Sequence, residues 1–403
     1  MKSKVEKAFI ESIDNNGVGI TSEGIKIPGT LPGEQILINN NILKVIKPAE
    51  TRVTPVCSHY KNCGGCTIQH AKSSFIKEWK FNIIESCLIE RGIKTDIRPI
   101  QTSESESRRR ATFHGLKTKK NVIVGFFKKG SHELVSTEKC KLVDPRIISK
   151  YPLFQELTKM GATRKSVINI VTTLTSSGLD LNIINGKTLD AKTKGEISGI
   201  CEVFKIARIT WNGDLLAQFS PPTIMFNKLA VTIEPETFLQ ATEQGQETLI
   251  KNVSDSVKGA SNVIDLFSGC GTFSLPIAQY AKILAVDKSE SMLSTLASAW
   301  RKNHGLKEIV CRAQDLFKNP ILKDELNLFD TVIIDPPRSG AEFQISEISD
   351  SKITRVSSVS CNPKTFSRDA KILIDGGFTL DWVQPIDQFL WSSHIEIVSQ
   401  FSR

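Results

Sequence analysis

The stretch Asp265-Leu-Phe-Ser-Gly-Cys-Gly-Thr-Phe-Ser274 decides the fold of this chain. The apolar run 262–267 leads into two glycines, Gly269 and Gly271, and is typical of a buried strand that breaks into a glycine turn. Residues 275–278 resume as the first turn of a helix, where a proline is tolerated. Strand, glycine turn and helix are the first unit of a doubly wound α/β sheet, and the glycines let backbone N–H groups approach a ligand.

The glycine turn favours a nucleoside ligand over a dinucleotide, because the third glycine of a dinucleotide-binding loop is missing. The next strand, 282–286, ends in Asp287, roughly 20 residues after the turn, where a carboxylate suits the two hydroxyls of a ribose. S-adenosylmethionine is such a nucleoside. A plain glycine turn in an ordinary α/β domain is the alternative.

The composition favours a protein of several domains that is not exported and that binds an anionic partner. The chain has 403 residues, 40% of them apolar, which is enough for two or three domains of about 150 residues. Its formal net charge of +9 suits nucleic acid. No apolar run approaches the ~20 residues of a membrane span, and residues 1–6 do not resemble a signal peptide. Nine cysteines without export indicate a reducing compartment, so we expect a cytoplasmic protein with metal-binding or catalytic cysteines.

Three domains are predicted. Residues 1–53 have short strands with close turn signals, which suggest a small OB-like β-barrel that binds RNA or caps the N-terminus. Residues 54–235 mix helix and strand and form an α+β domain. Residues 236–403 form an α/β domain with a seven-stranded, Rossmann-like sheet whose crossovers imply parallel strands. Its strands are expected at 262–267, 282–287, 308–312, 329–335, 354–360, 377–384 and 394–401.

Cysteines gather at the start of the central domain. Cys57, Cys63 and Cys66 are separated by short spacers, and two glycines let the loop wrap so that thiolates converge. Cys140 is the best candidate for a fourth ligand. Three local thiolates and one distant thiolate are a common iron–sulfur pattern, whereas a zinc site usually has two paired C-x2-C knuckles. Zinc and unrelated buried cysteines are the alternatives.

The chain is basic between these cysteines. Arg108-Arg-Arg110 precedes a predicted strand, and Lys117, Lys119 and Lys120 follow it. Side chains that contact the phosphates of RNA would have this pattern. A solvated β-hairpin edge would have it as well, so the pattern alone does not decide between the two.

A thiol and a carboxylate follow the central strands of the predicted sheet, where ligands of such sheets lie. Asp335 ends the fourth strand, Cys361 ends the fifth and Glu396 lies on the last. Carbon 5 of uracil is a poor nucleophile, but a thiolate that adds to carbon 6 makes carbon 5 able to attack a methyl sulfonium. A general base must then remove the carbon-5 proton so that the thiolate is expelled. Cys361 and Glu396 are candidates for these roles; a buried strand-end cysteine and a solvent-facing strand residue are the alternatives.

Several motifs together resemble the iron–sulfur-containing family of RNA 5-methyluridine methyltransferases, which are class I enzymes. The tail from Asp387 to Glu396 is similar to the C-terminal motif of that family. The other stretches are Cys57…Cys63-Gly-Gly-Cys66, Phe238-Leu-Gln240, Asp265-Leu-Phe-Ser-Gly-Cys-Gly-Thr272, Asp335-Pro-Pro-Arg-Ser-Gly340 and Ser360-Cys-Asn-Pro-Lys-Thr-Phe-Ser-Arg-Asp369.

The resemblance implies roles for individual residues. Cys361 would be the nucleophile and Glu396 the base. S-adenosylmethionine would be bound by Gln240, Phe267, Thr272, Asp287, Asp315 and Asp335. A [4Fe-4S] cluster would be held by Cys57, Cys63, Cys66 and Cys140.

The resemblance also implies the substrate. We expect a monomeric enzyme that methylates carbon 5 of one uridine in structured RNA, with 23S rRNA as the expected target, and that extrudes the target base. The T-loop uridine of tRNA is the alternative within the family, and a catalytically inactive RNA-binding iron–sulfur protein is the alternative outside enzymes. The cysteine pattern disfavours a DNA cytosine methyltransferase and a radical enzyme.

Overall fold

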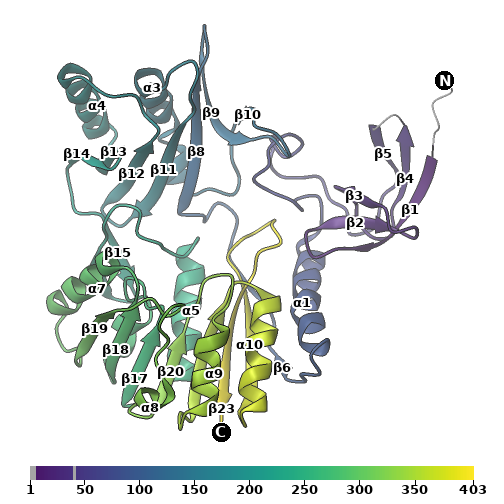
Figure 1. Ribbon diagram of the computed structural model, residues 1–403. Coiled ribbons are helices and arrows are strands. Elements are labelled where there is room, and N and C mark those ends of the chain that lie inside the picture. The colour runs from purple at the N-terminus through teal and green to yellow at the C-terminus, as the bar shows by residue number, and fades with distance from the viewer. Residues whose placement is uncertain (1–5, 40–41) are drawn as a thin grey trace.

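The computed structural model describes residues 6–39 and 42–403. In Figure 1 a large sheet with its helices forms the lower body, a second sheet lies above it, and a small N-terminal sheet stands to one side. Among the described residues, no helix has both the length and the apolar character that a bilayer crossing requires.

The lower body contains the Rossmann-like α/β sheet predicted for the C-terminal domain. All the expected strands form, in the order β19-β18-β17-β20-β21-β23-β22. They are β17 (Asn262–Leu266), β18 (Lys282–Asp287), β19 (Ile309–Ala313), β20 (Thr331–Ile334), β21 (Arg355–Ser360), β22 (Thr379–Asp387) and β23 (Glu396–Ser402).

The expectation of an all-parallel sheet is wrong at one strand. β23 pairs antiparallel with both β21 and β22. The short connection between β22 and β23 contains no helix, and only an antiparallel pair can be joined in that way. The sheet also extends past the predicted boundary at residue 235, because β6 (Asp96–Ile97) and β7 (Gln101–Thr102) pair in parallel with β22.

Helices cover both faces of this sheet. Neighbouring residues of β17 point to opposite faces, so Val263 packs into one apolar cluster and Ile264 into the other. α1 (Ser73–Ile89) supplies Ile84 and Leu88 to the second cluster and packs on α10. The other helices of this body are α5 (Glu243–Ser256), α6 (Ser274–Ile277), α7 (Glu290–Lys302), α8 (Lys323–Leu326), α9 (Glu342–Asp350) and α10 (Pro363–Asp375).

The upper body is a sheet in the order β10-β9-β8-β11-β12-β13-β14 with helices packed on it. Phe113 of the sheet packs on Phe154 of α3, and both are fully buried. Its strands are β8 (Arg110–Lys117), β9 (Val122–Phe127), β10 (Leu134–Ser136), β11 (Ile168–Thr175), β12 (Gly178–Ile184), β13 (Ile206–Trp211) and β14 (Asp214–Gln218). Its helices are α2 (Pro145–Ile148), α3 (Tyr151–Gly161) and α4 (Ala191–Val203), and the ribbon β15 (Thr223–Phe226) with β16 (Leu229–Thr232) leads to the lower body.

The N-terminal sheet is antiparallel in the order β3-β2-β1-β4-β5. Among the described residues no ladder joins β3 to β5, so closure into a barrel stays a prediction. The strands are β1 (Glu6–Ile13), β2 (Val18–Thr21), β3 (Lys26–Pro28), β4 (Gln35–Asn39) and β5 (Ile42–Lys47).

Candidate active site

A cavity of about 500 Å³ opens at the carboxyl ends of the parallel strands. With one exception, every residue predicted to bind the cofactor or to catalyse the reaction lines it. Thr272 is the exception: it lies half-buried in the glycine turn outside the lining. The predicted residues that do line the cavity are Gln240, Phe267, Asp287, Asp315, Asp335, Cys361 and Glu396.

The glycine turn fixes one wall of the cavity. β17 ends at Leu266, and Phe267 takes the left-handed conformation with φ +62°, which is uncommon outside glycine and recurs at functional sites. The Gly269 amide donates to Asp287 Oδ2 at 3.0 Å, and the Ser289 amide donates to Oδ1 at 2.8 Å. The two bonds hold the Asp287 carboxylate at the end of β18, the position predicted to bind a ribose.

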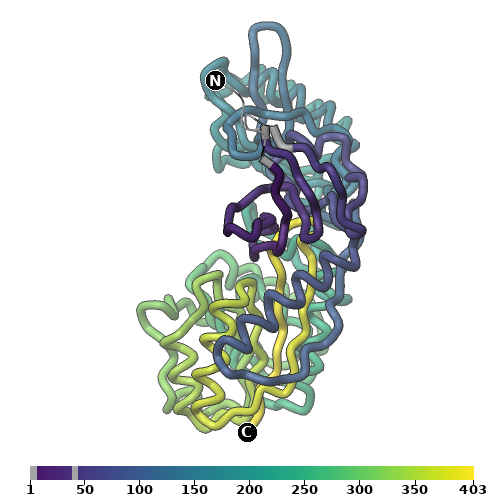
Figure 2. The backbone as a smooth tube through the Cα atoms, turned by 90° about the vertical axis from the view of Figure 1, so that its right-hand side faces the viewer, coloured from purple at the N-terminus to yellow at the C-terminus, as the bar shows by residue number. Residues whose placement is uncertain are grey.

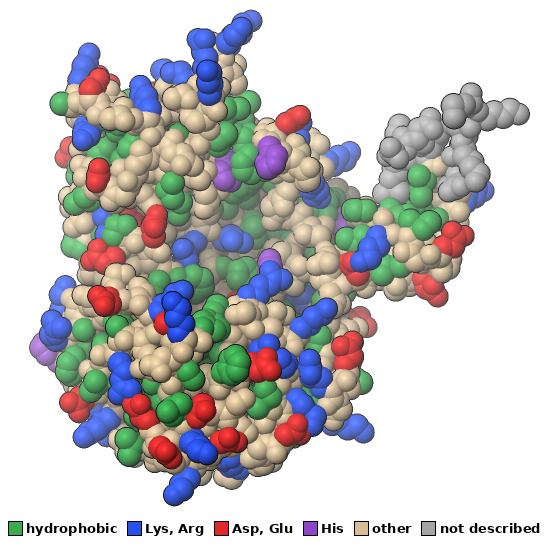
Figure 3. Space-filling model, in the orientation of Figure 1, with side chains coloured by type: hydrophobic (Ala, Val, Ile, Leu, Met, Phe, Trp, Pro, Cys, Tyr) green, Lys and Arg blue, Asp and Glu red, His purple; other side chains and the backbone are tan. Residues whose placement is uncertain are grey.

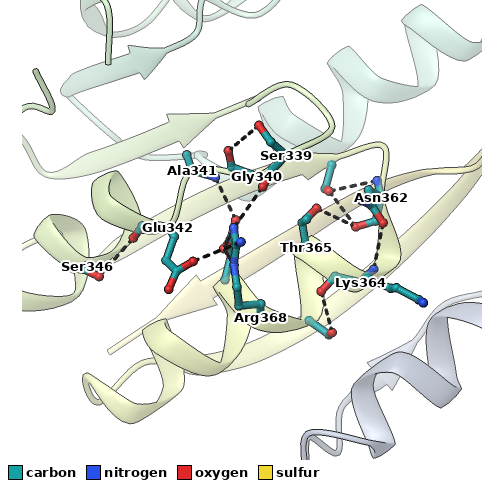
Figure 4. Close-up of polar contacts among 12 residues, drawn as sticks. Ser339, Gly340, Ala341, Glu342, Ser346, Asn362, Lys364, Thr365 and Arg368 are labelled. Carbon is teal, nitrogen blue, oxygen red and sulfur yellow. Dashed lines mark hydrogen bonds and ion pairs between the residues drawn. The ribbon is translucent and has the colours of Figure 1, made fainter. Parts of the chain in front are cut away.

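Hydrogen bonds join the loop that follows β20 to the loop that follows β21 and to α10, and Figure 4 shows how several of these residues lie. Asn362 donates to the carbonyl oxygen of Arg338 at 3.0 Å, and Arg368 donates to that of Ser339 at 3.2 Å. Asn362 also caps α10, because its side chain accepts from the Lys364 amide. Cys361 therefore lies between the last residue of β21 and the cap of α10, and it lines the cavity.

Glu396 begins β23 and is 6% exposed. Its pKa is raised to about 8, mainly by burial and also by the neighbouring Asp335, against a hydrogen bond from Gln388 that lowers it. Gln388 also donates to Gln240 Oε1 at 2.5 Å and accepts from the Ala241 amide at 2.8 Å. One amide therefore joins the predicted base to a predicted cofactor residue.

The acidic groups around the cavity disfavour one another's ionisation. Burial raises the pKa of Asp335 to about 7. The pKa of Cys361 is raised to about 11, mainly by burial and also by Glu396 and Asp335, and Arg338 opposes the rise. A cationic ligand would relieve this repulsion, so the charge of the lining fits a sulfonium.

The sequence prediction did not assign several apolar residues of the lining. Phe317 lies with its ring 5.5 Å from that of Phe267, and Met292 and Phe238 complete the apolar surface. Phe238 is 59% exposed and Phe317 46% exposed, which is unusual for aromatic side chains and suits contact with a flat base. Phe238 belongs to the motif Phe238-Leu-Gln240, but the motif gave it no role. Met292 lies in α7 and Phe317 in a loop, and neither belongs to a recognisable motif.

The four predicted metal-binding cysteines lie in one neighbourhood. The pKa of Cys66 is raised to about 12, mainly by burial and also by the neighbouring Cys140, Cys63 and Cys57. The loop of Cys57 to Cys66 is tied to β9, because the Gly64 amide donates to the Phe127 carbonyl at 2.8 Å. Within the described part of the chain, no three His, Cys, Asp or Glu residues are spaced to hold a metal ion.

The sequence pattern of the family described as tRNA (uracil-5-)-methyltransferase matches residues 89–402. The chain belongs to this family. It is an RNA uracil-C5 methyltransferase that uses S-adenosylmethionine.

Relatives match this methyltransferase along its full length. One from Brucella suis, named an uncharacterized RNA methyltransferase, is 34% identical over 409 residues, 100% of this chain and 99% of its own length. The 23S rRNA (uracil(1939)-C(5))-methyltransferase RlmD of Vibrio vulnificus is 25% identical over 429 residues, 100% of this chain and 97% of its own.

A solved structure shares the fold of this methyltransferase. The tRNA (uracil-54, C5)-methyltransferase of Pyrococcus abyssi, in complex with S-adenosyl-L-homocysteine, superposes with a TM-score of 0.77. The two share 21% sequence identity, and the match covers 98% of this chain and 99% of the other. The α/β methyltransferase architecture is therefore common to both.

Proposed function

We propose that this methyltransferase methylates carbon 5 of one uridine in 23S rRNA through a covalent adduct. Cys361 is the nucleophile and Glu396 is the base. The observation that carries the proposal is that both side chains line one cavity with Asp335 and the Asp287 carboxylate. A thiol and an acid that face one cavity are the two groups that this chemistry needs.

The Cys361 thiol first gives up its proton to water, a loss that a neighbouring sulfonium would favour. The thiolate then adds to carbon 6 of the uracil and makes carbon 5 nucleophilic. When bound, S-adenosylmethionine supplies the methyl group. Glu396 then takes the proton from carbon 5, and the Cys361–carbon 6 bond breaks to release the product. The raised pKa of Glu396 suits a base that must accept a proton near neutral pH.

The cofactor residues take roles that follow from their positions. Asp287 would hold the ribose of the cofactor, and Phe267 and Phe317 would contact its adenine. Burial raises the pKa of Asp335, and a cation beside it would stabilise the carboxylate and lower that pKa, which suits the sulfonium end of the cofactor. The complete proposed set is Gln240, Phe267, Thr272, Asp287, Asp315 and Asp335.

Ribosomal RNA is the proposed substrate because a full-length relative, the Vibrio vulnificus enzyme, is named for a uracil of 23S rRNA. The T-loop uridine of tRNA is the second candidate, because the Pyrococcus abyssi enzyme of the same fold acts on uracil 54 of tRNA. We assign the enzyme a monomeric state, with RNA as its partner. In Figure 3 Lys and Arg side chains lie in the hollow between the upper and lower bodies, where RNA phosphates would be attracted.

The choice between the two RNAs is tested by methyl transfer in vitro and by mapping in vivo. Purified enzyme with radiolabelled S-adenosylmethionine should label a 23S rRNA transcript and leave a tRNA transcript unlabelled. RNA from a strain without the protein should lack one 5-methyluridine in 23S rRNA by mass spectrometry of nuclease fragments. Label on tRNA alone would replace the first candidate with the second.

We also propose a [4Fe-4S] cluster held by Cys57, Cys63, Cys66 and Cys140. The donor types support this proposal, because three buried thiols and the half-buried Cys140 share one neighbourhood. The thiolates of such a cluster bind different irons, so they need not converge on one metal ion. Enzyme purified without oxygen should be brown and contain about four irons per chain. Colourless protein that contains zinc would contradict the cluster.

The proposed domain arrangement keeps residues 1–53 as an OB-like module, 54–235 as the cysteine domain and 236–403 as the methyltransferase domain. The five-stranded antiparallel sheet is compatible with an OB-like barrel. The contacts of α1, β6 and β7 with the last domain mean that these domains are expected to unfold together.

A further inference from the structure

Lys80 is a buried cation to which the proposed chemistry gives no role. It lies in α1, and its side chain is fully buried, as is that of Asp387, whose Oδ1 accepts from the ammonium at 2.7 Å. The ammonium also donates to the carbonyl oxygens of Phe389 at 3.3 Å and His394 at 2.9 Å. Three acceptors thus match the three donors of a lysine.

All three acceptors belong to the end of β22 and the connection 388–395 that leads to β23. This connection carries Gln388, which bonds Gln240, and it delivers Glu396 to the cavity two residues after His394. A shift of the connection would therefore move the base relative to the substrate. The backbone of the connection is held at its start and at its end by one side chain.

The helix that carries Lys80 is a rigid support. Ile84 and Leu88 of α1 are packed in the core beneath the sheet, and Figures 1 and 2 show α1 beside the C-terminal strands and helix. The tip of the connection is held from outside as well, because the Thr67 and Ile68 amides donate to the Trp391 carbonyl at 2.8 and 3.1 Å.

The buried pair of Lys80 and Asp387 is better explained by its control of backbone position than by a contribution to stability. Loss of hydration offsets most of the attraction in such a pair, and apolar side chains of similar volume are often as stabilising. Apolar side chains could not bond two carbonyl groups and a carboxylate at once. A group that fixes backbone position beside a reacting atom affects rate strongly, because a misplacement of about 1 Å can cost about 10²-fold.

We propose that Lys80, paired with Asp387, is a positioning residue that holds the connection 388–395 so that Glu396 reaches the carbon-5 proton. This inference rests on the proposed function, in which Glu396 is the base. It predicts that loss of the lysine impairs proton removal after the adduct has formed, while Cys361 can still attack.

Two double variants test the inference, and both leave a neutral buried pair so that no charge is stranded. Lys80→Met with Asp387→Asn removes every donor at residue 80, and Lys80→Gln with Asp387→Asn keeps an amide donor. The assay measures turnover under saturating RNA and cofactor, the unfolding temperature, and the fraction of enzyme that runs as a covalent RNA adduct on a denaturing gel.

The Met variant should fold, lose about 10²-fold in turnover and accumulate adduct. The Gln variant should lose less and accumulate less, as a partial rescue. Folded variants with wild-type turnover would overturn the inference, and so would slow turnover without adduct. If neither variant folds, the pair is structural and the inference is overturned. If only the Gln variant folds, slow turnover with accumulated adduct supports the inference, and any other result overturns it.

The buried pair of Asp180 and Arg208 in the upper body is the matched control. Asp180→Asn with Arg208→Met removes a pair of similar burial outside the lining of the cavity, and its folded fraction should turn over at the wild-type rate without accumulating adduct. Glu396→Gln separates the two proposals. If Glu396→Gln accumulates adduct and the Lys80 variants do not, only the positioning role of Lys80 fails. If Glu396→Gln accumulates no adduct, the assignment of Glu396 as the base fails.

Discussion

Asp180 in the upper body and Glu396 in the lower body are both buried carboxylates, yet their surroundings are opposite. Asp180 is 7% exposed and accepts from Arg208 Nε at 2.9 Å and from Nη2 at 2.8 Å. Glu396 is 6% exposed, but the charged group that most affects it is Asp335, which raises its pKa. Burial alone therefore does not distinguish a structural carboxylate from a functional one.

The groups next to each carboxylate distinguish the structural carboxylate from the functional one. Arg208 repays part of the lost hydration of Asp180 and opposes the effect of burial on its pKa. Around Glu396 the neighbours are an acid, a thiol and an amide, which leave a group that can gain or lose a proton near neutral pH. Such an arrangement is unfavourable for stability and useful for proton transfer.

The strongest test of this comparison removes the thiol from the functional cluster. Cys361→Ala should abolish methyl transfer, because no covalent adduct can form and carbon 5 stays unreactive. Affinity for S-adenosylhomocysteine, measured by calorimetry, should change little. Cys311→Ala, a half-buried cysteine on β19 outside the cavity, is the control and should keep its activity. Turnover by the Cys361 variant would defeat the nucleophile assignment.

The second test neutralises the functional carboxylate. Glu396→Gln should lower turnover by about 10² to 10⁴-fold, the usual contribution of a general base. The adduct should persist, because the carbon-5 proton cannot leave, and should appear as a slow band on a denaturing gel. A slow enzyme without such a band would place the base elsewhere.

The third test removes the partner of the structural carboxylate. Arg208→Met should lower the free energy of unfolding by about 3–5 kcal/mol, since it leaves Asp180 buried and unpaired. Denaturant titration measures this loss. Turnover per folded molecule should equal that of the wild type; a lower value would mean that the upper-body pair takes part in the reaction.

The fourth test is the pH dependence of stability. In the folded, ligand-free protein Glu396 keeps its proton up to about pH 8, whereas in the unfolded chain it ionises above its ordinary pKa of 4.5. The folded state binds the extra proton in this window, so its stability falls as pH rises from 4.5 to about 8.

Glu396→Gln cannot ionise and should avoid that loss. Its free energy of unfolding should exceed that of the wild type by of the order of 4 kcal/mol at pH 8, because the pKa is about 3.5 units above 4.5 and each unit corresponds to about 1.4 kcal/mol, and by nothing at pH 4. Thermal melts at the two pH values measure the difference. Equal melts at pH 8 would show that the carboxylate is not disfavoured by its surroundings.

Most of the lower body could be predicted because its signals are local. The apolar runs that became β17, β18 and β21 are short and end in glycine, aspartate or a proline-containing loop, so each strand and its carboxyl end could be located. Cys361 and Asp335 follow directly from those ends, since a side chain after a parallel strand faces the crevice.

The rest depended on contacts between distant parts of the chain. The antiparallel direction of β23 depends on its place between β21 and β22, and β6 is too short to be recognised without the edge strand that it joins. Phe317 and Met292 have no motif, and only the folded sheet brings them to the cavity.

The sequence by itself determined the succession of strands along the chain, the glycine turn, and which thiol and carboxylate lie near strand ends. These features depend on neighbouring residues. Only the tertiary structure decided which buried charges are paired. Lys80 reaches Asp387, and Glu396 is left beside Asp335, because packing brings together side chains that lie far apart in the chain. The same packing sets the hydration and the field at each carboxylate, and so its affinity for a proton.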